Sequence, residues 1–225
     1  MARHKTREAQ YQACVDEAEK LGVERLGMQQ SQSWRDDPKH LVFNLSRYKF
    51  VAKMLSGSNH VLEIGCGDAF GSRIVRQEVC HLTATDFDKI FIEDAKSRMR
   101  GPWMFTVMVH DLSQGPVPGT FDGIYALDVL EHVRQKDEKH FMQAILASLD
   151  QHGVLIIGMP SLESQLYASE RSKVGHINCK SMPDFKSMMQ RYFHNVFMFS
   201  MNDEVVHTGF HKMAHYLFAV GCSRR

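Results

Sequence analysis

Two glycines that follow a short apolar segment are the first candidates for a functional role. Residues without a side chain let the backbone itself contact a ligand. The run Val61-Leu-Glu-Ile-Gly-Cys-Gly-Asp-Ala-Phe-Gly71 begins as a strand pattern and ends in glycines. Without a Cβ at Gly65 and Gly67, the backbone can turn sharply and approach a ligand closely. Two glycines alone also fit an ordinary tight turn, so the residues around them decide.

An aspartate strengthens the ligand-binding interpretation. Asp86 ends the next apolar segment, about 20 residues further on, where a carboxylate can accept hydrogen bonds from both hydroxyls of a ribose. A nucleotide-type ligand is therefore predicted, and a helix-capping aspartate is the alternative. A dinucleotide fingerprint would have glycine where Phe70 stands, and no Lys-Ser/Thr pair follows to form a P-loop. A ligand without phosphate fits better.

The elements that must position these residues alternate in type from residue 60 onward. Strands are expected over 60–64, 82–86, 103–109, 121–127 and 154–159, with helices between them. This alternation predicts a parallel sheet with helices on both faces, and the ligand of such a sheet binds at the carboxyl ends of its strands. The first of these helices is expected over 69–77, with Asp68 as its cap.

The two ends of the chain differ from this pattern. Two strand patterns near 196–199 and 213–220 follow a helix that starts at Ser181, and strands without a crossover between them must pair antiparallel. We expect an α/β fold with a doubly wound, mainly parallel seven-stranded sheet and an antiparallel last strand. Two helices, separated by a polar loop over 29–38, should precede the sheet. The predicted division is an N-terminal helical cap or lid over 1–57 and a ligand-binding domain over 58–225, together one structural unit.

Composition narrows the class of protein. The 225 residues include 27 Lys and Arg against 26 Asp and Glu, and this balance argues against a general nucleic-acid or membrane-surface binder. A hydrophobic content of 44% excludes disorder for the bulk of the chain, and no apolar stretch approaches the roughly 18 residues of a membrane span. We see no secretory signal and no CxxC pairing among five cysteines, so we expect a cytoplasmic protein with reduced thiols.

Several motifs, in this order, resemble those of class I S-adenosylmethionine-dependent methyltransferases. They are Arg47-Tyr48, Val61-Leu-Glu-Ile-Gly-Cys-Gly67, Thr85-Asp86, His110-Asp111-Leu112, Phe121-Asp122 through Leu127-Asp128-Val-Leu-Glu-His132, and the fifth strand over 153–160. The resemblance covers roughly residues 46–222, and the family's antiparallel seventh strand agrees with the hairpin predicted above. Ala69 stands where many members have glycine.

The resemblance implies S-adenosylmethionine as the cofactor, with S-adenosylhomocysteine as its product. Gly65 and Gly67 would pass beneath the methionine part, and Glu63 would hold its amino group. Arg47 could pair with the methionine carboxylate, and Asp128 would belong to the same binding site.

The same resemblance implies an adenosine half for the site. Asp86 would bind the ribose hydroxyls, and Phe87 would flank the adenine. Asp111 would accept a hydrogen bond from the adenine amino group, beside the Leu112 backbone.

Two of the thirteen histidines stand out by position. His132 follows the fourth strand and shares one short turn with Asp128 and Glu131, which resembles the corresponding region of ubiquinone-biosynthesis O-methyltransferases, some of which need a metal. An orienting role, a general base and a divalent metal site all stay open. The metal is the least favoured of these, and no residue is assigned as a ligand.

His176 lies in a polar segment over 161–180 that follows the fifth strand, where a long insertion often shapes a substrate pocket. We expect His132 and His176 to be catalytic, with alanine at either lowering turnover while cofactor affinity is retained.

These observations predict methyl transfer to a small polar acceptor, with oxygen as the methylated atom. The expected partner is a small-molecule substrate, without nucleic acid or membrane, and a homodimer stays open. Alternatives are an RNA or protein methyltransferase, a cofactor-binding protein without catalysis, and a nucleotide-dependent oxidoreductase, which Phe70 and the terminal hairpin oppose.

Overall fold

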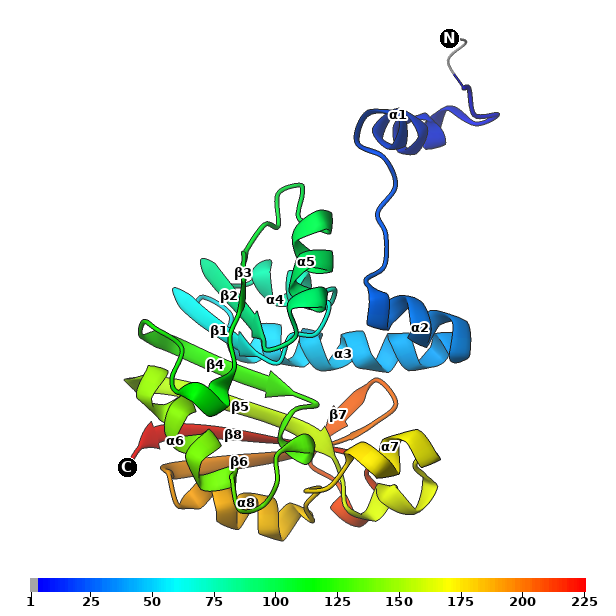
Figure 1. The fold of residues 1–225 in the computed structure, drawn as a ribbon. Coiled ribbons are helices and arrows are strands. Elements are labelled where there is room, and N and C mark those ends of the chain that lie inside the picture. The colour runs from blue at the N-terminus through cyan, green and yellow to red at the C-terminus, as the bar shows by residue number, and fades with distance from the viewer. Residues whose placement is uncertain (1–3) are drawn as a thin grey trace.

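An eight-stranded sheet runs through the centre of the structure, a computed structural model that describes residues 4–225 (Figure 1). The strand order is β3-β2-β1-β4-β5-β8-β6-β7. The strands are β1 His60–Ile64, β2 His81–Asp86, β3 Thr106–Val109, β4 Phe121–Leu127, β5 Leu149–Pro160, β6 Phe193–Asn202, β7 Val205–His207 and β8 Tyr216–Arg224. The α-helices are α1 Gln12–Leu21, α2 Met28–Asp36, α3 Pro38–Met54, α4 Ser72–Arg76, α5 Lys89–Arg98, α6 Glu138–Ser148, α7 Glu170–Gly175 and α8 Met182–Gln190.

Strand direction confirms the predicted α/β fold. Strands β3, β2, β1, β4 and β5 pair parallel with their neighbours, and β8 runs antiparallel between β5 and β6. The predicted pairing of the last two long strands is confirmed. The sheet has eight strands and not seven, because residues 205–207 add the short edge strand β7 to β6.

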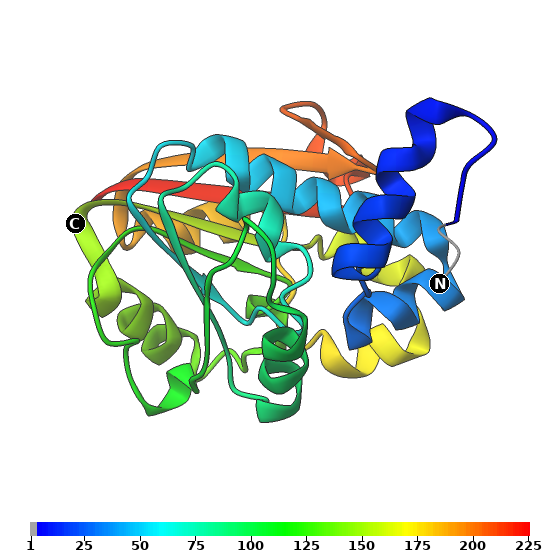
Figure 2. The ribbon, with the colours of Figure 1, turned by 90° about the horizontal axis from the view of Figure 1, so that it is seen from above.

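Alternate residues of the central strands face opposite sides of the sheet, and both faces are covered by helices. Ile124 of β4 packs in a buried cluster with Met142 of α6. Its neighbour Tyr125 packs in a second cluster with Val51 of α3 and with Leu55, the C-cap residue of that helix. Figure 2 shows α3 along one side of the sheet and α6 on the other. Helix α3 is therefore part of the core of the sheet domain. The predicted division of the chain after residue 57 stays a prediction.

Residues 29–38 are mostly helical, so the predicted polar loop is wrong. Helix α2 begins after Gly27, and its first N–H groups are bonded by carboxylates of the sheet domain: Gln30 N donates to Asp68 Oδ2 at 3.0 Å, and Met28 N to Asp94 Oδ2 at 3.4 Å. A helix start leaves such N–H groups without intrahelical partners. Tertiary contacts therefore stabilise a helix that has little apolar pattern of its own. Helix α1 ends at Leu21 with Gly22 as its C-cap residue, and it projects away from the sheet (Figure 1).

Asp68 does not cap the helix that follows it, which corrects the sequence prediction. Helix α4 starts at Ser72, with Gly71 as its N-cap residue. Ala69 has a φ of 53°, in the left-handed region, and this conformation prevents a right-handed helix from starting there. The same conformation explains why glycine is favoured at this position in the family that the motifs resemble.

No helix among residues 4–225 is long and apolar enough to span a lipid bilayer.

Candidate active site

A cavity of about 800 Å³ lies at the carboxyl ends of β1, β2 and β4, where the sequence predicts the ligand. This volume is within the usual range of small-molecule sites. Most of the predicted site residues line it: Gly65, Gly67, Asp86, Phe87, Asp111, Leu112, Asp128 and His132. The others, Arg47, Glu63 and His176, are not among its lining residues.

The two glycines after β1 have conformations that glycine adopts most easily. Their φ angles are 69° at Gly65 and 52° at Gly67. A Cβ on Gly65 would lie 2.4 Å from Val129 Cγ2, and one on Gly67 would lie 2.0 Å from Gln29 Oε1. The loop therefore has no room for side chains at these two positions, and its backbone lines the cavity.

Asp86 connects this loop to the end of β2. One carboxylate oxygen accepts from Gly67 N at 2.8 Å, and the other accepts from Asp88 N at 2.8 Å. Each carboxylate oxygen can accept about two hydrogen bonds, so capacity remains for hydroxyl groups in the cavity. The neighbouring Phe87 is 73% exposed at the cavity rim.

Asp111 and Leu112 line the part of the cavity next to β3. Asp111 accepts from Ser113 N at 2.9 Å, and hydrogen bonding by Ser113 lowers the pKa of the Asp111 carboxyl. The backbone here is bonded to the β2 end, since His110 N donates to Asp86 O at 2.9 Å. Asp111 therefore offers an ionised acceptor close to Asp86 and Phe87.

Arg47 is buried beside the cavity in an ion pair. Its Nη1 donates to Asp128 Oδ2 at 2.7 Å, and its guanidinium carbon lies 3.9 Å from the ring centre of Tyr216. Asp128 has a φ of 57°, a left-handed conformation that aspartate tolerates better than most residues. Arg47 thus holds the carboxylate of Asp128, which does line the cavity.

Glu63 lies inside the protein, 1% exposed. Its Oε2 accepts a hydrogen bond from the Tyr125 hydroxyl at 2.8 Å, and burial raises the pKa of Glu63 to about 7. The structure therefore places this carboxyl behind the glycine-containing loop and not in the cavity.

Residues from the N-terminal helices line the cavity without having been predicted to do so. They are Gln29 and Gln30 of α2 and Asn44 of α3, together with Tyr48, which the sequence analysis noted only as part of a motif. Gln29 Oε1 accepts from Asp68 N at 3.3 Å and so lies against the loop. Their sequence neighbourhood does not indicate a ligand-binding position, because they reach the cavity only when α2 packs against the sheet domain.

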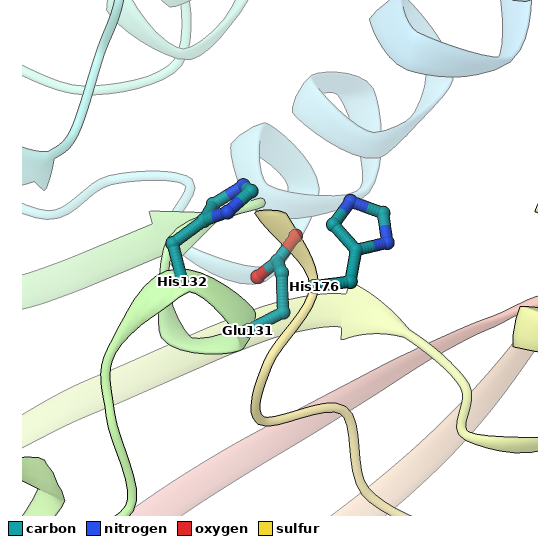
Figure 3. A group of neighbouring side chains, drawn as sticks. All are labelled: Glu131, His132 and His176. Carbon is teal, nitrogen blue, oxygen red and sulfur yellow. The ribbon is translucent and has the colours of Figure 1, made fainter. Parts of the chain in front are cut away.

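His132 and His176 are brought together with Glu131 (Figure 3). One possible ligand atom from each residue lies within 4.8 Å of the others, and the two imidazole centres are 5.3 Å apart. The contact forms because the Glu131 carbonyl accepts from Ile177 N at 2.9 Å and Asn178 N at 3.0 Å. The polar insertion after β5 is thereby fixed against the turn after β4.

Glu131 is fully buried in this group. Neither carboxylate oxygen has a hydrogen-bond partner in the part of the chain that the structure describes. Burial and the nearby charge of Asp128 raise the pKa of Glu131 well above its usual range. Such a carboxyl is energetically costly unless something else compensates it.

A second cavity of about 440 Å³ lies on the other side of the histidine pair. Its lining is His176 with the polar residues Gln135, Gln165, Lys180 and Asp184 and the less polar Leu162, Ile177 and Cys179, whereas His132 lines the larger cavity. The two histidines therefore stand between the predicted cofactor site and a smaller cavity with both polar and apolar lining.

An adenosyl ligand without phosphate fits the larger cavity. Bare main chain at Gly65 and Gly67 gives a cradle that side chains would fill, and Asp86 offers free acceptor capacity beside it. A basic side chain near the glycine-containing loop can bind a pyrophosphate. The residues that line the cavity at the ends of β1 and β2 include none.

Comparison with known proteins supports this interpretation. Residues 61–153 match the sequence family described as a methyltransferase domain, and no curated protein matches the chain. Among solved structures, the methyltransferase domain of bacterial CtHen1 superposes with a TM-score of 0.67 at 16% identity, covering 80% of this chain and 98% of that one. The N-methyltransferase NodS from Bradyrhizobium japonicum, in complex with S-adenosyl-L-homocysteine, gives 0.63 at 15%, covering 84% and 90%. An S-adenosylmethionine-dependent methyltransferase from Clostridium acetobutylicum gives 0.65 at 12%, covering 86% and 97%.

The matched methyltransferase domain over residues 61–153 and the shared fold support a class I S-adenosylmethionine-dependent methyltransferase. The same findings support S-adenosylmethionine as the methyl donor and S-adenosylhomocysteine as the product. The finer resemblance to ubiquinone-biosynthesis O-methyltransferases stays a prediction.

Proposed function

We propose that this enzyme transfers the methyl group to an oxygen of a small polar acceptor. The observation that carries the proposal is the position of His132, which lines the larger cavity, and of the neighbouring His176, which lines the second cavity together with Gln165. A donor in the first cavity and an acceptor in the second would meet at these two imidazoles.

The cofactor side follows from the cavity lining. In this proposal Gly65 and Gly67 lie under the methionine part, and Asp128, held by Arg47, accepts from its amino group. Arg47 then acts through Asp128 and not on the methionine carboxylate directly. Glu63 supports the loop from behind through Tyr125.

The adenosine side keeps the assignments that the motifs imply. Asp86 binds the ribose hydroxyls with its remaining acceptor capacity. Phe87 covers the adenine from the rim, and Asp111, beside Leu112, accepts from the adenine amino group.

Hydrogen bonds leave a lone pair on each histidine for the acceptor. The Gly175 carbonyl can only accept, so His132 donates to it from Nδ1 (2.9 Å) and keeps a lone pair on Nε2. His176 Nδ1 lies 2.9 Å from Gln165 Oε1, and the amide nitrogen of Gln165 donates to Ser161 O, which fixes the amide orientation. Both Nε2 atoms can therefore engage an acceptor hydroxyl.

S-adenosylmethionine supplies an activated methyl group on a sulfonium, which is a good leaving group. The protein's task is to align the acceptor oxygen with that methyl group, exclude water, and assist loss of the hydroxyl proton. His132 and His176 perform this task at the junction of the two cavities.

Methylation assays on a panel of acceptors test the proposal. The panel should contain polyols, phenols, amines and a short RNA, with products identified by mass spectrometry. We expect methylated oxygen products, and His132→Ala and His176→Ala should lower kcat strongly while S-adenosylhomocysteine affinity is retained.

His152→Ala changes an exposed histidine near the start of β5; it is the matched control and should retain full turnover. Products methylated only on nitrogen or RNA would contradict the proposal, as would unchanged turnover in both active-site variants. Tight cofactor binding without any product would favour a cofactor-binding protein.

A further inference from the structure

We propose that Glu131, His132 and His176 bind a divalent transition-metal ion between the two cavities. Its function in catalysis rests on the proposed hydroxyl acceptor, whereas binding itself can be tested without it. From the sequence alone, a metal was the least favoured role for the turn that holds Asp128, Glu131 and His132.

The geometry of the three side chains suits one ion. Their ligand atoms lie within 4.8 Å of one another. Metal bonds to imidazole and carboxylate are about 2.0–2.2 Å long, so opposite ligands of one ion are at most about 4.4 Å apart. Small side-chain rotations would therefore bring all three onto a common ion.

Glu131 provides an independent reason. It is fully buried, it comes from the short turn after β4, and both of its oxygens lack partners within residues 4–225. Buried carboxylates in proteins are normally paired, hydrogen-bonded or bound to a metal. A cation facing His132 and His176 would supply the missing interaction.

The surroundings of both histidines match those of metal ligands. A histidine that binds a metal through one nitrogen usually donates its other N–H to a carbonyl, carboxylate or water. His132 donates from Nδ1 to Gly175 O, and His176 donates from Nδ1 to Gln165 Oε1. Both Nε2 lone pairs are thus available, with the rings already oriented (Figure 3).

The segment that carries His176 is fixed without a metal. Lys180 and Glu138 form a largely buried ion pair at 2.7 Å, and Asn178 donates to the same Glu138 carboxylate at 3.1 Å. A Cβ on Gly175 would lie 3.1 Å from His132 Cε1, so the missing side chain allows this close approach. The site is therefore largely preorganised.

The ligand set favours particular metals. Two imidazoles with one carboxylate suit Mn²⁺, Fe²⁺, Co²⁺ or Zn²⁺, whereas Mg²⁺ and Ca²⁺ prefer oxygen ligands. Three protein ligands leave coordination positions open, and a hydroxyl bound to such an ion becomes more acidic. With the ion bound, the histidines would act on the acceptor through the metal and not as free bases.

Metal titrations of the full chain, first stripped with a chelator, test the site. We expect calorimetry and the Mn²⁺ electron paramagnetic resonance signal to give one Mn²⁺ per chain, with Mg²⁺ binding at least tenfold more weakly. Glu131→Gln and His176→Ala should abolish this binding, and Gln165→Leu should weaken it about 10- to 100-fold. His152→Ala should bind as the wild type does.

Glu131→Gln also shows whether loss of binding reflects unfolding. Its metal-free chain should unfold at the same temperature as the wild type or higher, because the amide replaces an uncompensated buried carboxyl. Wild-type affinity in both Glu131→Gln and His176→Ala would place the ion elsewhere and overturn the proposal. Absence of binding for Mn²⁺, Co²⁺ and Zn²⁺ would overturn it as well.

Failure of the proposed function gives a different result. Binding of Mn²⁺ at these residues in a chain that methylates no hydroxyl acceptor would support the metal site and contradict O-methylation.

Discussion

The carboxylate of Asp86 accepts a hydrogen bond from the backbone N–H of Gly67 at 2.8 Å. The acidic end of β2 and the bare loop after β1 are therefore one structural unit, although they lie apart in the chain. A ligand that meets the loop also meets the carboxylate, which is the arrangement that an adenosyl group requires for its ribose.

Alanine at Gly67 should impair ligand binding more than it impairs folding. The left-handed conformation costs a residue with a Cβ roughly 1–2 kcal/mol, and the new methyl group would meet Gln29. Gly57→Ala is the matched control, because Gly57 has a φ of 84° and open space around it. Chemical denaturation should show a loss in the free energy of unfolding in both variants, and only Gly67→Ala should lose S-adenosylhomocysteine affinity. Equal affinity in the two variants would contradict the role of the loop.

Removal of the Asp68 carboxylate should loosen α2. This carboxylate accepts from Gln30 N and Phe70 N, and loss of such a helix cap costs about 1 kcal/mol. In Asp68→Ala, hydrogen exchange at the start of α2 should be faster, and S-adenosylhomocysteine should protect α2 less than in the wild type. Ser181→Ala, which removes the cap of α8, is the control and should leave α2 unchanged. Unchanged exchange in Asp68→Ala would show that this carboxylate does not stabilise the start of α2.

The buried carboxyl of Glu63 should make stability fall as the pH rises. Its pKa in the folded chain is about 7, above the usual 4.5, so between these values the folded state holds a proton that the unfolded state has lost. The free energy of unfolding should decrease across this window, by up to about 3 kcal/mol from this group. Below the window the contribution is absent, and above it the full cost remains.

Glu63→Gln isolates this effect because the amide does not titrate. Relative to the wild type, its free energy of unfolding should rise between about pH 4.5 and about pH 8. Glu17→Gln, which changes an exposed residue of α1, should show no such trend. Parallel pH profiles for Glu63→Gln and the wild type would show that the buried carboxyl is not responsible.

Much of the sheet and the cofactor cavity could be predicted because their signals are local. The bounds predicted for β1 and β4, 60–64 and 121–127, are those observed, since each is an apolar run next to turn residues. Asp86 and Gly67 were predicted to share a site, because parallel strands present their carboxyl ends at one edge.

Contacts between distant segments could not be predicted in this way. Helix α2 has a polar sequence, and its start is stabilised by Asp68 from the loop after β1. The ion pair of Arg47 with Asp128 joins a helix to a strand end, and nothing near either residue marks it. His176 reaches Glu131 only through the fold of the insertion after β5.

Titration calorimetry with S-adenosylhomocysteine, on the wild type and Asp86→Ala, tests the central claim most directly. The wild type should bind well below millimolar concentration. Loss of charged hydrogen bonds worth about 1.5–3 kcal/mol should weaken the Asp86→Ala variant roughly 10- to 100-fold. A wild type that binds only at millimolar concentration or above, together with a variant that behaves identically, would contradict an adenosyl site at this edge of the sheet.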